Sequence, residues 1–178
     1  LPLQIFGKHN LSNLEAARKV CSLLGVFDQD FYTAIASFTG ASKRLEVIYK
    51  DSSNLLIRDF AHSPSKLTAS VNATRETFKD NFIIGVYELH TFSSLDPNFI
   101  NQYSGSLDSC DLPIVFYDKI NKKIQDSNSI NNKIISNAFN IQNLIIIDNS
   151  EDLFSYLMSI EYKKTCLLLM SSGNFGSM

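Results

Sequence analysis

Apolar and polar positions recur along the chain with two different periods, and the changes between them mark out helices and strands. At the start, apolar residues are spaced as on a helix from Leu11 to Leu24, and Gly25 follows as a natural stop. A second helical period runs from Asp28 to Phe38 and ends at Thr39-Gly40. The pattern therefore predicts two successive helices before any strand.

Two short β-type runs come next, Leu45 to Lys50 and Asn54 to Phe60, and the polar turn between them predicts an antiparallel hairpin. Pro64 then suits the first turn of a helix, because its fixed φ is helical and its missing N–H is not needed there. Ser63 is the expected N-cap, and the apolar stripe of this helix continues to Phe78.

The rest of the chain alternates strands and helices. Runs without polar alternation predict parallel strands buried on both faces, and these runs are Phe82 to Glu88, Leu112 to Tyr117, Leu144 to Ile147 and Cys166 to Met170. The helical segments between them are long enough for right-handed crossovers, and they are Pro97 to Leu107, Asn131 to Phe139 and Glu151 to Tyr162. The polar segment from Lys119 to Asn132 is expected to be a solvated loop.

These elements predict a single α/β domain over residues 1–178. The expected architecture is a three-layer, Rossmann-like domain with a mostly parallel sheet of about six strands and one antiparallel hairpin near the N-terminus.

Composition and charge argue against two classes of partner, membranes and nucleic acids. The apolar runs are far shorter than the roughly 18 residues of a membrane-spanning helix, and the first residues do not form a signal peptide, so a cytoplasmic protein without a membrane partner is expected. The net charge of −2, with no basic run, argues against a nucleic-acid partner. Three widely spaced cysteines are expected to be buried free thiols. A start on Leu1 instead of methionine suggests a piece of a longer protein.

Ligands of open α/β sheets bind beyond the carboxyl ends of the strands, so polar residues at those ends are candidate site residues. His62 and His90 each follow a predicted strand directly, and Asp59 at a strand end is suited to ribose hydroxyls. Arg44, before the hairpin, offers a forked cation for phosphate oxygens. Each residue also has an ordinary alternative. The two histidines can be structural or surface residues, Asp59 can be a turn carboxylate, and Arg44 can be a surface cation.

Asn10 and Asn13 lie one helical turn apart at the start of the first helix. Their amides both donate and accept hydrogen bonds, so they can match the edge of an adenine. The alternative is that Asn10 caps the helix and Asn13 is solvated in its first turn. The common self-contained phosphate-loop, dinucleotide and hydrolase motifs are absent from this sequence.

An ordered set of motifs resembles the C-terminal domain of the Mur ligases. The set comprises Gly7-Lys8-His9-Asn10-Leu11-Ser12-Asn13, Phe38-Thr39-Gly40, Lys43-Arg44-Leu45-Glu46, Asp59-Phe60-Ala61-His62-Ser63-Pro64 and Glu88-Leu89-His90-Thr91-Phe92-Ser93. The final Leu169-Met170-Ser171-Ser172-Gly173-Asn174-Phe175-Gly176 is similar to the murein peptide ligase branch. The resemblance implies a ligase that uses ATP to join an amino acid or peptide to UDP-N-acetylmuramate through an acyl phosphate.

The resemblance also implies roles for individual residues. The residues expected to bind ATP are Asn10, Asn13, Arg44 and Asp59. The residues expected to face the incoming substrate are His62, Ser63, His90, Thr91 and Ser94. No catalytic or metal-binding residue is assigned to this chain, because the family carries its phosphate loop and Mg²⁺ site mainly on a central domain. The chain alone is therefore expected to be inactive, with the N-terminal and central domains of the same protein as partners.

Two departures from the family pattern bear on the substrate. The L-alanine-adding enzymes have a second histidine where this chain has Ser63, and arginines where it has Thr91 and Ser94. Because such arginines can hold the carboxylate of a small amino acid, a peptide such as L-alanyl-γ-D-glutamyl-meso-diaminopimelate is expected instead. The alternatives are the same domain of an L-alanine-adding ligase, a non-catalytic module that binds a nucleotide or small ligand, and a purely structural domain.

Overall fold

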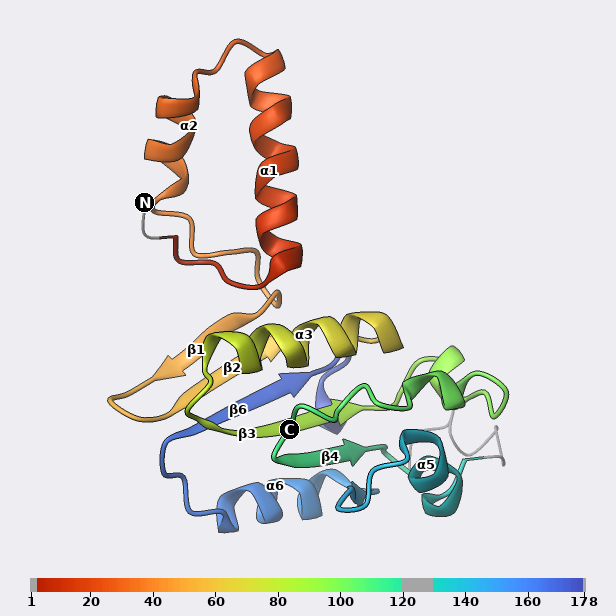
Figure 1. Cartoon of the computed structure of the whole chain (residues 1–178). Helices are drawn as coiled ribbons and strands as arrows, with labels where there is room; N and C mark the ends of the chain where they lie inside the picture. The colour runs from red at the N-terminus through yellow and green to blue at the C-terminus, as the bar shows by residue number, and fades with distance from the viewer. Residues whose placement is uncertain (1–2, 120–129, 178) are drawn as a thin grey trace.

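The computed structural model describes residues 3–119 and 130–177, and the strands in this part of the chain form one sheet of six. The strands are β1 Glu46–Lys50, β2 Leu55–Asp59, β3 Phe82–Glu88, β4 Leu112–Phe116, β5 Ile145–Ile147 and β6 Thr165–Met170. They lie in the order β1-β2-β6-β3-β4-β5 (Figure 1). Every neighbouring pair is parallel except β1 and β2. The predicted mostly parallel sheet is confirmed.

The antiparallel pair is the predicted hairpin. Glu46 lies opposite Arg58, and their side chains pair at 2.9 Å. In the connecting turn, Asp51 Oδ1 accepts hydrogen bonds from the backbone nitrogens of Ser53 and Asn54, both at 2.7 Å. These bonds favour the ionised carboxylate and lower the pKa of Asp51 to about 2. The turn is thus fixed by its own aspartate.

Helices cover both faces of the sheet. The helices are α1 Lys8–Leu23, α2 Asp28–Ile35, α3 Pro64–Thr77, α5 Asn132–Phe139 and α6 Ser150–Ser159. Successive residues of a strand point to opposite faces. Ile83 packs in one apolar cluster with residues of α3 and α5, whereas Ile84 packs in a second cluster with residues of α6. The three-layer prediction is confirmed.

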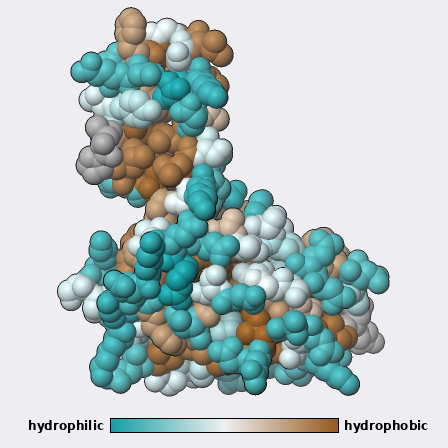
Figure 2. Space-filling model, in the orientation of Figure 1, coloured by the Kyte–Doolittle hydropathy of each residue, from teal (hydrophilic) through white to brown (hydrophobic). Residues whose placement is uncertain are grey.

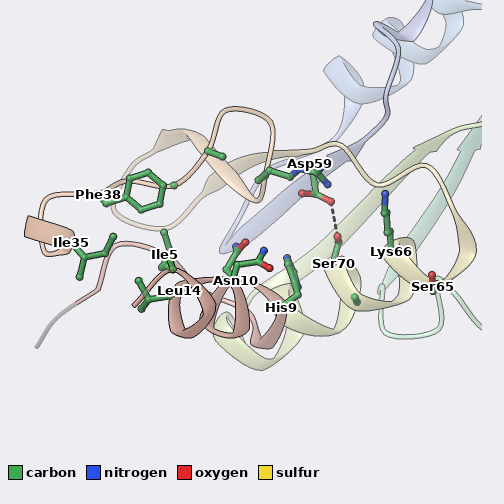
Figure 3. Close-up of a pocket in the computed structure, with 16 residues that line it drawn as sticks. Ile5, His9, Asn10, Leu14, Ile35, Phe38, Asp59, Ser65, Lys66 and Ser70 are labelled. Carbon is green, nitrogen blue, oxygen red and sulfur yellow. Dashed lines mark hydrogen bonds between the residues drawn. The ribbon is translucent and has the colours of Figure 1, made fainter. Parts of the chain in front are cut away.

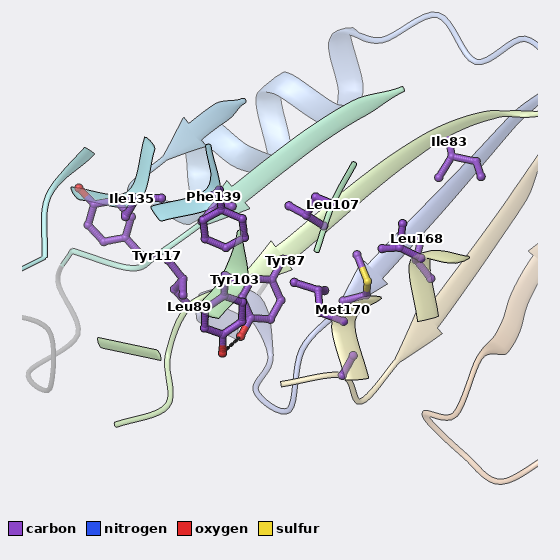
Figure 4. Packing of buried hydrophobic residues seen from close by; sticks show 14 of the residues in the cluster. Ile83, Tyr87, Leu89, Tyr103, Leu107, Tyr117, Ile135, Phe139, Leu168 and Met170 are labelled. Carbon is purple, nitrogen blue, oxygen red and sulfur yellow. Dashed lines mark hydrogen bonds between the residues drawn. The ribbon is translucent and has the colours of Figure 1, made fainter. Parts of the chain in front are cut away.

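Aromatic rings fill the larger of the two clusters. Tyr103 and Phe139 stack with their ring centroids 5.4 Å apart, and Tyr87 packs against both (Figure 4). The hydroxyl of Tyr87 donates to that of Tyr103 at 2.7 Å. Burial raises the pKa of both tyrosines. The pair therefore stays neutral inside the core.

The helix predicted over Pro97 to Leu107 is wrong. That segment contains the 3-10 helix η2, Ile100–Tyr103, and a further 3-10 helix, η1 Ser93–Leu95, precedes it. Asp96 Oδ1 accepts a hydrogen bond from the backbone nitrogen of Asn98 at 2.9 Å, as at a helix N-cap, but the residues that follow form turns and a 3-10 helix. The helical spacing of apolar residues reflects burial alone, because Ile100, Tyr103 and Leu107 are all in the core.

The helix ends also refine the predictions. α1 begins at Lys8 with Gly7 at its N-cap, so Asn10 lies in the first turn and does not cap the helix. α3 begins at Pro64 with Ser63 at the N-cap as predicted, although the Ser63 side chain makes no capping hydrogen bond. Of the predicted loop from Lys119 to Asn132, residues 120–129 lie outside the described residues, and Asn132 is the first residue of α5.

The helical pair α1–α2 projects away from the sheet (Figure 1). No residue of α1 is buried, and Leu23, Leu24 and Phe27 are 88%, 78% and 77% exposed. In the space-filling view, a larger apolar patch lies at the base of the pair and smaller apolar areas lie at its tip (Figure 2). The predicted apolar stripe of α1 is therefore present but is not covered by the part of the chain that the structure describes.

The three cysteines are free thiols, as predicted, but they differ in burial. Cys166 is fully buried, whereas Cys21 and Cys110 are partly exposed. Burial raises the pKa of the Cys110 and Cys166 thiols to about 12. Among the described helices, none has the length and apolar character needed to cross a bilayer.

Candidate functional site

A cavity of about 660 Å³ lies between the base of the helical pair and the α3 side of the sheet (Figure 3). This volume is within the roughly 300–1,000 Å³ typical of small-molecule sites. Its walls come from α1, from the segment 35–44, from the end of β2 and from the first half of α3. The cavity therefore exists only because distant parts of the sequence meet.

The cavity has two chemically different ends, seen in Figure 3. Apolar side chains gather at one end, namely Ile5, Leu14, Ile35 and Phe38. Polar side chains gather at the other, namely Asp59, Ser65, Lys66 and Ser70. His9 and Asn10 lie between the two groups. A ligand with an apolar, hydrogen-bonding ring and an anionic tail matches this arrangement.

All four residues expected to bind ATP line this cavity: Asn10, Asn13, Arg44 and Asp59. The side-chain nitrogen of Asn10 donates to the carbonyl oxygen of Phe6 at 2.9 Å, which fixes the orientation of its amide. Asn13 lies one turn further along α1 and is exposed. The geometry thus brings the two amides to one wall, and their contact with adenine stays a prediction.

Arg44 is held in an unusual loop. The residues on either side of it, Lys43 and Leu45, have positive φ values of 57° and 46°, which side chains rarely adopt. The guanidinium carbon lies 5.3 Å from the centre of the Phe60 ring, a cation–π distance. Among the described residues no acidic side chain pairs with Arg44. The cation is therefore positioned without being neutralised.

Asp59 is only 3% exposed, and its carboxylate already serves the protein. Its Oδ1 accepts from the backbone nitrogen of Leu45 at 2.8 Å. Its Oδ2 accepts from the Ser70 hydroxyl at 2.6 Å and from the backbone nitrogen of Ala61 at 3.1 Å. The Ala61 contact is the turn-carboxylate role that the sequence left open for Asp59, whereas its ties to α3 and to the Arg44 loop were not foreseen. A ribose contact would have to use its remaining accepting capacity and stays a prediction.

The residues expected to face the substrate do not line this cavity. They follow β2 and β3, and β6 lies between these two strands, so their carboxyl ends meet at one edge of the sheet. His62 Nδ1 lies 3.0 Å from the carbonyl oxygen of Phe60. The His62 carbonyl oxygen accepts from the Tyr103 hydroxyl at 3.1 Å and lies 3.2 Å from the Tyr87 hydroxyl, whose proton goes to Tyr103. Ser63 follows as the N-cap of α3.

The loop after β6 meets the end of β3. His90 Nε2 lies 3.0 Å from the Ser172 hydroxyl. Glu88, 5% exposed, accepts through Oε2 from the Phe175 backbone nitrogen at 3.1 Å and from the Ser171 hydroxyl. In the sequence analysis, the segment Leu169 to Gly176 contributed a family motif and no contact with Glu88. Glu88, the acidic residue at the end of a predicted strand, was the sequence feature that could have indicated this contact.

Thr91 and Ser94 close a local turn on each other. The backbone nitrogen of Thr91 donates to Ser94 Oγ at 3.0 Å, and that of Ser94 donates to Thr91 Oγ1 at 3.2 Å. Ser94 is fully buried, whereas Thr91 is partly exposed. Their contact with a substrate stays a prediction, and the segment from Glu88 to Leu95 carries no lysine or arginine.

In residues 3–119 and 130–177, no three or more His, Cys, Asp or Glu side chains are grouped so that they could hold a metal ion. The two buried carboxylates at the strand ends, Asp59 and Glu88, are engaged by donors of the protein itself.

Comparison with known proteins gives sequence relatives that carry the name UDP-N-acetylmuramate–L-alanine ligase. No family model matches the chain. A UDP-N-acetylmuramate–L-alanine ligase of Cutibacterium acnes is 36% identical over 116 residues, which are 65% of this chain and 24% of that protein. A ligase of the same name from Desulfitobacterium hafniense is 24% identical over 174 residues, or 97% of this chain and 38% of that protein. The chain thus spans less than two fifths of these relatives.

Solved structures share the fold. A UDP-N-acetylmuramate–alanine ligase from Thermotoga maritima superposes with a TM-score of 0.78 at 19% identity, over 97% of this chain and 36% of that one. A murein peptide ligase from Psychrobacter arcticus gives a TM-score of 0.61 at 18% identity, over 99% of this chain and 36% of that one. At 19% and 18% identity, these neighbours show that the chain shares their fold.

Proposed function

We propose that this chain is the C-terminal domain of an ATP-dependent peptidoglycan ligase of the Mur family, and that it closes over the nucleotide and the incoming substrate. One observation carries the proposal. Asn10 and Asn13 of α1, Arg44 of the loop before β1 and Asp59 at the end of β2 line a single cavity of nucleotide size. A structural domain would have no need to bring two amides and an uncompensated arginine together around an open space.

The proposed reaction transfers the γ-phosphoryl group of ATP to the muramate carboxylate, and the incoming amine then displaces phosphate from the acyl phosphate. In this scheme Asn10 and Asn13 hold the base, and Arg44 contacts the anionic side of the nucleotide. Closure of the domain would exclude water and bring the reacting groups into line, which is how positioning accelerates such transfers. His62 and His90 would then face the substrate from the sheet edge.

The proposed partner of the helical pair is the central domain of the same protein. Leu23, Leu24 and Phe27 expose apolar surface that the described residues leave uncovered. The relatives are more than twice as long as this chain, which leaves room for such a domain. The same domain would supply the phosphate loop and the Mg²⁺ ion, so the chain alone should not ligate.

For the added group we propose a peptide, L-alanyl-γ-D-glutamyl-meso-diaminopimelate, because Thr91 and Ser94 stand where forked cations would hold a free amino acid. The second candidate is L-alanine. It is favoured by the sequence relatives, which carry the name of the L-alanine ligase. The two candidates share the nucleotide cavity and differ only at the edge formed by the ends of β2, β3 and β6.

The deciding experiment measures ATP-dependent phosphate release by the full-length protein with UDP-N-acetylmuramate and either the tripeptide or L-alanine. A higher kcat/KM with the tripeptide supports the peptide proposal. A higher value with L-alanine replaces it with the second candidate, and no release with either overturns the ligase proposal. Independently, the upstream reading frame should encode a Gly-Lys-[Ser/Thr] phosphate loop, and a frame without one would count against the proposal.

A further inference from the structure

Lys66 is a second cation on the cavity wall, and no role was assigned to it from the sequence. It lies in the first turn of α3, which begins at Pro64, and it lines the same cavity as Arg44 and the asparagines of α1. In Figure 3 its side chain lies near Asp59 and Ser70, at the end opposite Ile35 and Phe38. Lys66 therefore belongs to the polar end of the cavity.

The place of Lys66 in the helix is unfavourable on local grounds. The N-terminal turn of a helix has a partial positive charge, which disfavours lysine and favours acidic residues. The first turn of α3 has no acidic residue, and the Ser63 side chain makes no capping bond. Natural sequences break such local rules mainly where a site requires it. A negatively charged ligand would turn this unfavourable position into a favourable one.

The surroundings do not neutralise this cation. In the part of the chain that the structure describes, no carboxylate pairs with Lys66 or with Arg44. Asp59, the only acidic residue that lines the cavity among those described, is engaged by the Leu45 and Ala61 backbone nitrogens and by the Ser70 hydroxyl. The cavity thus offers two cations, Lys66 and Arg44, that no carboxylate of the described residues pairs with.

We propose that Lys66 binds the phosphate chain of the nucleotide together with Arg44, so that this cavity selects nucleoside polyphosphates over nucleosides. The inference rests on the proposed function, because it assumes that the ligand is a nucleotide, and it adds a residue and a selectivity. Lysine binds phosphate as a compact point charge, whereas Arg44 offers a planar fork, so the two cations can contact different oxygens of one phosphate chain.

The test is the binding of ADP and of adenosine to the full-length protein, by calorimetry, for the wild type and for Lys66→Gln. The glutamine variant keeps most of the side-chain length and removes the charge. ADP binding should weaken about tenfold, whereas adenosine binding should change less than about twofold, because a charge-assisted hydrogen bond to phosphate is lost and the base contacts remain. The dependence of ADP affinity on salt should also become weaker.

Lys79→Gln is the matched control. Lys79 is an exposed lysine just beyond the C-terminal end of α3 and does not line the cavity, so its loss should leave ADP affinity unchanged. Equal loss for ADP and adenosine, or no loss for either, would overturn the role of Lys66 while leaving the nucleotide cavity standing. If Asn13→Ala also leaves the binding of both ligands unchanged, the cavity itself is not the nucleotide site, and both proposals fail.

Discussion

The backbone nitrogen of Leu45 donates a hydrogen bond to Asp59 Oδ1 at 2.8 Å, and this contact ties the loop that carries Arg44 to the end of β2. Because the other carboxylate oxygen accepts from Ser70 on α3 at 2.6 Å, one buried side chain fixes two walls of the cavity. The acidic residue at this strand end therefore positions its neighbours, whether or not it also contacts a ribose.

Asp59→Ala should destabilise the 178-residue chain by about 3 kcal/mol, because three donors lose a buried charged acceptor. Ser70→Ala removes only one of those donors and should cost about 1.5 kcal/mol. Urea unfolding followed by circular dichroism measures both. Ser65→Ala, an exposed serine of the same helix, serves as the control. Equal stability of Asp59→Ala and the wild type would show that these hydrogen bonds contribute nothing.

Gly85, in the centre of β3, leaves no free space for a Cβ atom. A Cβ atom there would overlap Cys110 Sγ, while Cys110 Cβ and Met170 Cε would remain at 3.5 Å. Gly85→Ala should therefore lower the free energy of unfolding by about 2 kcal/mol, because the core becomes overpacked.

The cost should fall when Cys110→Ala is added, since the overlapping sulfur is then absent. A double-mutant cycle by urea unfolding measures this coupling. Additive effects of the two substitutions would contradict the proposed contact.

The ionised Asp51 in the hairpin turn should make the free energy of unfolding depend on pH. Backbone hydrogen bonds lower the pKa of Asp51 from 3.8 to about 2 in the folded chain. A lowered folded pKa means that this contribution to stability is complete above the unfolded pKa and is lost as the pH falls through about 2. The stability difference between the wild type and Asp51→Asn should therefore be constant near neutral pH and shrink over this acidic window.

Thermal unfolding of both proteins at a series of pH values gives the measurement. Asp80→Asn, at an exposed position outside the turn, is the comparison variant. A difference between wild type and Asp51→Asn that does not change with pH would show that the turn does not depend on the ionised carboxylate.

Asn13→Ala in the full-length protein should raise the KM for ATP about fivefold and leave the KM of the added peptide or amino acid nearly unchanged. The expected loss is one hydrogen bond to the base, about 1 kcal/mol. Ser12→Ala, a neighbouring exposed position of α1 that does not line the cavity, is the control. An unchanged KM for ATP would leave Asn13 as a solvated residue of the first helical turn.

The sequence was a good guide wherever local chemistry and burial agree. Pro64 marked the first residue of α3, Asp51 and its neighbours marked the hairpin turn, and β3 follows its apolar run from Phe82 to Glu88. The predicted helix after Pro97 failed because buried residues at helical spacing also occur in a segment of turns and 3-10 helix. Spacing reports which residues are buried and only indirectly how the backbone runs.

The candidate site, like the fold, could be predicted from the sequence only in part. The sequence by itself determined the α/β class, the order of the strands along the chain and the residue types suited to a nucleotide, because these follow from periodicity and side-chain chemistry. Only the tertiary structure decided that Lys66 shares a cavity with Arg44, and that Asp59 is engaged by Leu45 and Ser70. Such contacts join residues distant in sequence, and the packing of α1 and α3 around the end of β2 creates them.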